Sequence, residues 1–270
     1  MMLLNPDSDI RAQPRYEGCT LSAEAGREQM TGLFTSSGNT RLDQAFNQEY
    51  AWLTGVFGVR PSLFMYEDSD GPNAKAMPVS YKPGQFQGTV IFGINLLRSE
   101  FERNPVNFTI PAILAHEFGH IIQFTGRIQL TGKLIELHAD YIAGWYMKHR
   151  DTAWSEISIR QSMDGFYRIG DYDFNSPLHH GTPDERLNAF LGGVRDSSSN
   201  VAAMVRNGSQ FVTQNFGGGG TIGPSTGGSA RSTRTETDEE ILSAIRRIVR
   251  ESSSNFRGIR GERGILDNER

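Results

Sequence analysis

His116-Glu117-Phe118-Gly119-His120 is the stretch of this 270-residue chain on which the interpretation of the fold depends. It lies within an apolar segment, Thr109 to Thr125, whose pattern predicts a long helix. Residues four apart lie on the same face of a helix, so both imidazoles can reach one cation. The carboxylate between them points elsewhere, toward a water that the same metal holds. The motif therefore predicts His116 and His120 as metal ligands and Glu117 as a general base.

A second stretch, Glu136-Leu137-His138-Ala139-Asp140, lies in the next predicted helix, Gly132 to Arg150. Two helices joined by a short loop pack antiparallel, which turns Glu136 back toward the two histidines. We therefore predict Glu136 to be the third ligand of a zinc ion, with a water in the fourth position. Asp140 lies one turn further on the same face, and we predict that it accepts a hydrogen bond from a ligand histidine. His138 is interpreted as a packing residue rather than a fourth ligand.

The same residues also have plainer interpretations. The two histidines can make ordinary hydrogen bonds within a helix, and Glu136 and Asp140 can belong to a solvated acidic face. Apolar neighbours argue against both, because burying two histidines and a glutamate is costly unless something pairs with them. These neighbours are Ile113, Leu114, Phe118, Ile121 and Ile122 in the first segment, and Leu134, Ile135, Ile142, Ala143 and Trp145 in the second. Zinc suits two imidazoles and a carboxylate, and other divalent metals are the alternative.

The rest of the pattern predicts an α+β fold, in which a small antiparallel sheet lies beside a bundle of helices. Strand-like segments are Arg60 to Tyr66, Ala74 to Val79 and Thr89 to Phe92. Further helices are predicted at Thr40 to Thr54, where Gly55 is the stop signal, and at Leu96 to Arg103, residues 153–168 and Asn200 to Gln214. Thr182-Pro183-Asp184-Glu185 predicts the start of one more helix, which Gly192 and Gly193 are expected to end.

The chain divides by composition into four segments. Residues 1–39 form an irregular arm, and residues 40–216 form the domain that carries the metal motif. Residues 217–236 are rich in Gly, Ser and Thr, which is typical of a flexible linker. Residues 237–270 form a tail, in which 238–250 places apolar side chains along one stripe of a helix. We expect this helix to bind a partner or to dock on the chain itself.

Composition excludes several classes of function. The net charge of -4 gives no electrostatic drive toward nucleic acid. No run of ~18 apolar residues occurs, so no transmembrane helix is expected. The single cysteine, Cys19, rules out an intramolecular disulfide. We expect a cytoplasmic protein, and a secreted form that has lost its signal peptide stays open as the alternative.

Together the two motifs resemble a family of zinc metallopeptidases, the gluzincins. His-Glu-Phe-Gly-His followed by Glu-Leu-His-Ala-Asp is similar to the branch that includes the CAAX prenyl endoprotease and the heat-shock membrane protease HtpX. It is more similar still to their relatives known as neutral zinc metallopeptidases. His180, followed six residues later by Arg186, resembles a later histidine of the family, and Asn73-Ala74-Lys75-Ala76 resembles a strand near its cleft. The resemblance spans residues 40–195.

The resemblance implies a zincin-like fold and a zinc-dependent endopeptidase that acts on a peptide or protein, with Glu136 as the third ligand. His180 is the candidate donor to the oxyanion, and Arg186 is expected to organise that region by charged hydrogen bonds. His179 competes for the role of His180. An extended peptide is expected to pair along the edge of the Ala74 to Val79 strand. The alternatives are an inactive binding module of the same fold and a zinc hydrolase of a non-peptide amide.

Overall fold

The computed structural model describes residues 32–69, 73–81, 87–103, 108–150, 162 and 180–217. The chain divides into two compact units, Met1–Gly218 and Gly219–Arg270, and every described residue lies in the first. Most of the N-terminal arm, the helix predicted at 153–168 apart from Ser162, and the tail helix predicted at 238–250 lie outside the described residues. Among the described helices, none has the length and apolar character needed to cross a membrane.

Helices and one small sheet make up the described part of the chain, which confirms the α+β class. In chain order the elements are α2 (Thr40–Phe57), β1 (Ser62–Tyr66), β2 (Ala74–Met77), β3 (Thr89–Gly93), α3 (Ile94–Arg103), α4 (Thr109–Gly126), α5 (Lys133–Arg150), α7 (Pro183–Arg195) and α8 (Val201–Phe216). The start predicted for α7 is confirmed, because Thr182 and Glu185 form a reciprocal capping box with Pro183 in the first turn.

The three strands form a mixed sheet, so the prediction of an antiparallel sheet was wrong. The strand order is β1-β3-β2, and β2 pairs antiparallel with β3 while β1 pairs parallel with it. The chain passes from β1 to the far edge as β2 and then returns as β3 between the two. All five residues of β3 are buried, which suits a central strand. The two reversals of direction leave β1 and β3 parallel.

Two glycine signals predicted helix ends in the wrong place. Helix α2 continues through Gly55 to Phe57 and ends at Gly58, whose φ of 69° is left-handed. Helix α7 continues through Gly192 and Gly193 to Arg195. A Cβ at Gly193 would overlap the carbonyl oxygen of Tyr141 in α5. Glycine therefore lets α5 and α7 approach closely here and does not mark a stop.

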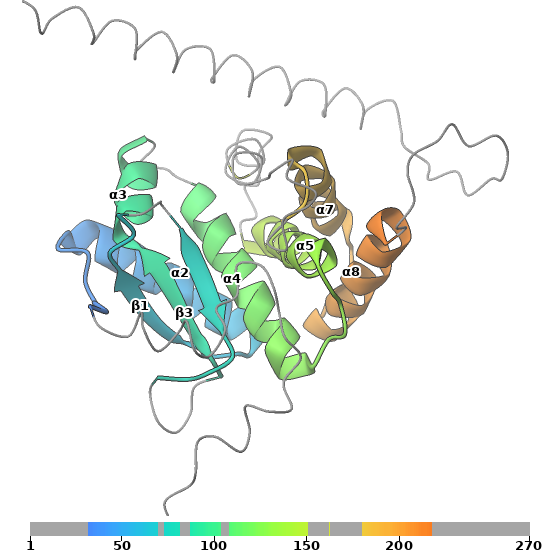
Figure 1. Ribbon diagram of the computed structural model, residues 1–270, viewed down its shortest axis with the longest axis horizontal. Helices are drawn as coiled ribbons and strands as arrows, with labels where there is room; N and C mark the ends of the chain where they lie inside the picture. Colours follow the sequence, from blue (N-terminus) through green and yellow to red (C-terminus); the bar gives the residue numbers. More distant parts are fainter. Residues whose placement is uncertain are drawn as a thin grey trace, which may run out of the picture. The chain divides into compact units, whose positions relative to one another are not determined.

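Helix α4 is the central element, and it lies between the sheet on one side and α5 on the other (Figure 1). Helix α2 packs against both the sheet and α4: the rings of Phe46 and Phe92 lie 5.1 Å apart, and those of Tyr50 and Phe118 lie 5.8 Å apart. Helix α5 in turn contacts α7 and α8. The segment that carries the His-Glu-Phe-Gly-His motif is therefore enclosed on several sides.

Candidate metal centre

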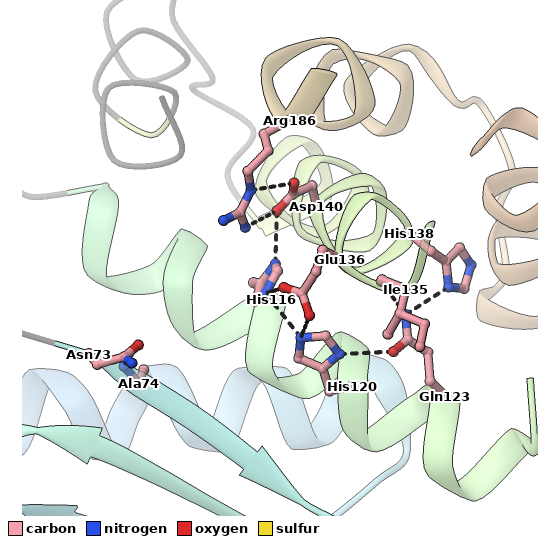
Figure 2. A network of polar contacts seen from close by, with 10 residues as sticks. All are labelled: Asn73, Ala74, His116, His120, Gln123, Ile135, Glu136, His138, Asp140 and Arg186. Atoms are coloured by element: carbon pink, nitrogen blue, oxygen red, sulfur yellow. Dashed lines mark hydrogen bonds and ion pairs between the residues drawn. The ribbon is translucent and has the colours of Figure 1, made fainter. Parts of the chain in front are cut away.

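The close approach of α4 and α5 forms the site. A Cβ at Gly119 would lie 3.0 Å from the Cα of Ala139, so glycine at this position lets the two helices pack almost backbone to backbone. His116 and His120 face α5 from one side, and Glu136 faces α4 from the other (Figure 2). All three side chains are buried. The structure thus brings together the three residues that the sequence predicted as ligands.

The three residues form a group that could bind a metal ion. The two Nε2 atoms of His116 and His120 lie 3.1 Å apart. Oε2 of Glu136 lies 3.4 Å from His116 Nε2, and Oε1 of Glu136 lies 3.6 Å from His120 Nε2. In a tetrahedral site with metal–ligand bonds near 2.0–2.1 Å, the ligand atoms are about 3.3–3.4 Å apart. The two imidazole nitrogens and the nearest carboxylate oxygen of each therefore lie at distances close to those between ligands of one tetrahedral ion.

The electrostatics of Glu136 favour its ionised form. Burial would raise the pKa of this carboxyl, but the imidazoles of His120 and His116 hold the pKa well below its ordinary value. An ionised carboxylate beside two imidazole nitrogens is the state that coordinates a divalent cation.

The buried ion pair of Asp140 and Arg186 holds the ring of His116. Nδ1 of His116 lies 2.8 Å from Oδ1 of Asp140, and Arg186 donates two hydrogen bonds of 2.8 and 2.7 Å to the same carboxylate (Figure 2). Burial opposes ionisation of Asp140, but the guanidinium and the hydrogen bonds keep the pKa of Asp140 below its ordinary value. With Nδ1 donating to a carboxylate, the Nε2 lone pair of His116 faces Glu136.

The hydrogen bond expected of Asp140 is thus present, and the structure adds Arg186 to it. Arg186 was predicted to organise the oxyanion region, whereas its guanidinium lies on Asp140 and is 1 % exposed. Arg186 is therefore connected to His116 through the carboxylate of Asp140. Asp140 and Arg186 neutralise each other, which leaves Glu136 as the anionic group of the ligand set.

Gln123 holds the second histidine, and the sequence analysis missed it. Its Oε1 lies 2.9 Å from Nδ1 of His120, and its Nε2 donates to the carbonyl oxygen of Ile135 at 2.8 Å. The only sequence signal was a single amide one turn after His120 in an otherwise apolar stretch. His138, interpreted as a packing residue, is fully buried against α8, and burial lowers its pKa to about 4.

The remaining predicted residues lie around this group. Glu117 is buried, follows His116 in α4 and does not belong to the set of ligand atoms. His180 is half-buried and immediately precedes Gly181, whose φ is 95°. Its role as a donor stays a prediction, and its competitor His179 lies outside the described residues. Asn73 immediately precedes β2, and its carbonyl accepts a hydrogen bond from the backbone N–H of Gly93 in β3.

Comparison with protein-family models, with curated proteins and with solved structures finds no match for this chain. The centre comprises the buried imidazoles of His116 and His120 and the ionised, buried carboxylate of Glu136. A further buried carboxylate belongs to Glu117, the residue that follows His116.

Proposed function

We propose that this chain is a zinc-dependent endopeptidase with a zincin-like fold, in which His116, His120 and Glu136 hold the metal. The observation that supports this most strongly is that the two Nε2 atoms lie 3.1 Å apart, with Oε2 of Glu136 3.4 Å from His116 Nε2 and Oε1 of Glu136 3.6 Å from His120 Nε2, distances near those between the ligand atoms of a tetrahedral site. A ligand set of three leaves the fourth position to a water, as in catalytic rather than structural zinc sites.

Zinc is the metal that the donor set favours. Two imidazoles and one carboxylate suit zinc, whereas magnesium and calcium prefer oxygen ligands alone. Hydrogen bonds to the Nδ1 atoms of both histidines leave each Nε2 as the ligand atom. A zinc ion in this site would make its water acidic enough to lose a proton near neutral pH.

Glu117 is the residue that would take that proton. It adjoins a ligand on the same helix, and its burial keeps the carboxylate away from bulk water. After accepting the proton, the same carboxyl group can pass it to the departing amine of the peptide. His180 is proposed as the donor that stabilises the oxyanion, on the strength of the family resemblance alone.

The sheet offers a place for an extended substrate. Strand β2 is at the edge of the order β1-β3-β2, and α4 packs directly against it. No strand of the described residues pairs with its outer edge. A peptide that pairs with that edge would run beside α4, the helix that carries both histidines and Glu117.

The experiment compares the full-length wild type with Glu117→Gln in a library of fluorogenic peptides, with zinc content measured on both. We expect the wild type to cleave a subset of peptides. Glu117→Gln should keep its zinc and lose a factor of about 10²–10⁴ in turnover, the usual contribution of a general base. Glu102→Gln, the same change at an exposed position in α3, is the matched control and should cleave normally.

Other outcomes would favour the alternatives. A wild type that binds zinc and cleaves no peptide but hydrolyses other amides is a zinc hydrolase of a different substrate class. One that binds zinc and hydrolyses neither is a binding module. Cleavage by Glu117→Gln at the wild-type rate would show that another group acts as the base.

A further inference from the structure

A chain of hydrogen bonds connects His120 with helix α8. It runs from Nδ1 of His120 to the amide of Gln123 at 2.9 Å, and from that amide to Nδ1 of His138 at 3.1 Å. The other nitrogen of His138 lies 3.1 Å from the carbonyl oxygen of Val205 in α8. Figure 2 shows Gln123 between the two histidine rings, with Ile135 beside it. The path thus joins a candidate metal ligand on α4 to a helix that contributes no ligand.

The carbonyl of Ile135 fixes the direction of each hydrogen bond between His120, Gln123, His138 and Val205. A backbone carbonyl only accepts, so the NH₂ group of Gln123 must face Ile135. Its second N–H then points at His138, and its oxygen faces His120. It follows that His120 carries its proton on Nδ1.

His138 takes the opposite tautomer for the same reason. Its Nδ1 accepts from the amide, so its Nε2 carries the proton and donates to the carbonyl of Val205. With the proton of His120 on Nδ1, the lone pair of Nε2 is directed at His116 and Glu136.

Helix α8 is shaped to receive His138. A Cβ at Gly208 would lie 2.9 Å from Cδ2 and 3.1 Å from Nε2 of that ring, so a larger residue would push it out. Ser209 adds a hydroxyl 3.3 Å from the same Nε2. His138 is fully buried and Gln123 is 1 % exposed, so water cannot readily replace these bonds.

The two histidines are held by different chemistry. The partner of His116 is a carboxylate that Arg186 neutralises, whereas the partner of His120 is a neutral amide. A carboxylate in place of Gln123 would face the carbonyl oxygen of Ile135 and the lone pair on Nδ1 of His138. An amide is the group that can accept from one imidazole and donate to the other at once.

We propose that Gln123 is a positioning residue that orients His120 for metal binding, and that His138 connects this residue to α8. The packing of α8 on α5 then contributes to metal affinity, although α8 supplies none of the three ligand residues. This inference rests on the proposed metal site and adds to it the residues that tune its affinity.

Gln123→Met is the principal test, because methionine keeps the length of the side chain and removes every hydrogen bond. Loss of such an outer partner of a metal ligand usually weakens binding about 10- to 100-fold. We expect the zinc dissociation constant of the full-length chain, measured by competition with a chromophoric chelator, to rise by that factor. Gln129→Met, on the exposed loop after α4, is the matched control and should bind like the wild type.

His138→Leu tests the connection to α8. The variant keeps the bond from Gln123 to the carbonyl of Ile135, so it should bind zinc more weakly than the wild type and more tightly than Gln123→Met. The tautomers are read without metal, by ¹⁵N NMR of the histidine rings. In the wild type we expect the proton of His120 on Nδ1 and the proton of His138 on Nε2. In His138→Leu, His120 should still prefer the Nδ1 tautomer, but less strongly than in the wild type.

The outcomes separate this inference from the proposed function. A wild type that binds no zinc overturns the proposed metal site itself. A wild type that binds zinc, beside a folded Gln123→Met within about twofold of its affinity, overturns the positioning role. If Gln123→Met does not fold, two other results would overturn the positioning role. One is a His138→Leu variant that binds zinc as tightly as the wild type. The other is an NMR spectrum of the wild type that shows the proton of His120 on Nε2.

Discussion

Replacing Arg186 tests how the centre is held together. Among the described residues, Arg186 has one of the largest fully buried side chains, and its two hydrogen bonds to Asp140 are 2.8 and 2.7 Å long. In Arg186→Met the carboxylate of Asp140 would keep its hydrogen bond from His116 and, among the described residues, would lose its guanidinium partner. Asp140 would then be a buried carboxylate that has lost its arginine counterion.

The expected loss of stability is large. Breaking a buried ion pair by removing one partner costs about 3–5 kcal/mol, because the other charge stays buried. Replacing both partners by apolar residues costs much less, because no charge remains. The double variant Asp140→Leu/Arg186→Met should therefore be destabilised by less than the sum of the two single variants.

The assay is denaturant unfolding of the full-length chain in the presence of a chelator, so that metal binding does not contribute to the free energy of unfolding. Wild type, the two single variants and the double variant complete the cycle. A folded Arg186→Met within about 1 kcal/mol of the wild type would refute the reasoning, since it would mean that Asp140 is not paired as the structure shows. Additive single effects would refute the coupling between the two residues.

Three further predictions concern the scaffold. Gly193→Ala should destabilise the fold by about 1–3 kcal/mol or more, because its methyl group would overlap the carbonyl of Tyr141; thermal unfolding measures this. Asp68→Ala should cost about 1–2 kcal/mol in denaturant unfolding, because the carboxylate accepts from the backbone N–H groups of Asn95 and Leu96 at the start of α3. Burial opposes ionisation of Asp196, but hydrogen bonds lower its pKa in the folded chain below that in the unfolded chain. Its contribution to stability is therefore present above about pH 4 and lost as the pH falls through the folded-state pKa. The free energy of unfolding of Asp196→Asn, measured with denaturant, should therefore change less with pH in that range than that of the wild type.

The helical part of the site could be predicted because its signals are local. His116 and His120 share a helix face by their spacing alone, and Glu136 follows from a short connection between two helices. Thr182 and Glu185 likewise cap α7 with residues that are neighbours in the sequence. The histidine pair and the capping box each need only a few consecutive residues to be recognised, and Glu136 needs only the short connection from α4 to α5.

The features that were missed depend on residues far apart in the chain. The pairing of β1 with β3 spans 27 residues of sequence, from Ser62 to Thr89, and strand patterns do not tell which strands become neighbours. Gly193 looks like a helix stop until the carbonyl of Tyr141 is known to lie against it. Gln123 acquires its role only when α5 brings Ile135 and His138 to it. No periodicity carries that information.

Metal content per chain is the measurement that tests the central claim most directly. It is made by elemental mass spectrometry on the purified full-length chain and on His116→Ala. The account predicts about one zinc per wild-type chain and almost none in the variant, because one of three ligands is gone. No metal in folded wild type after zinc has been supplied, or equal zinc in both proteins, would contradict it.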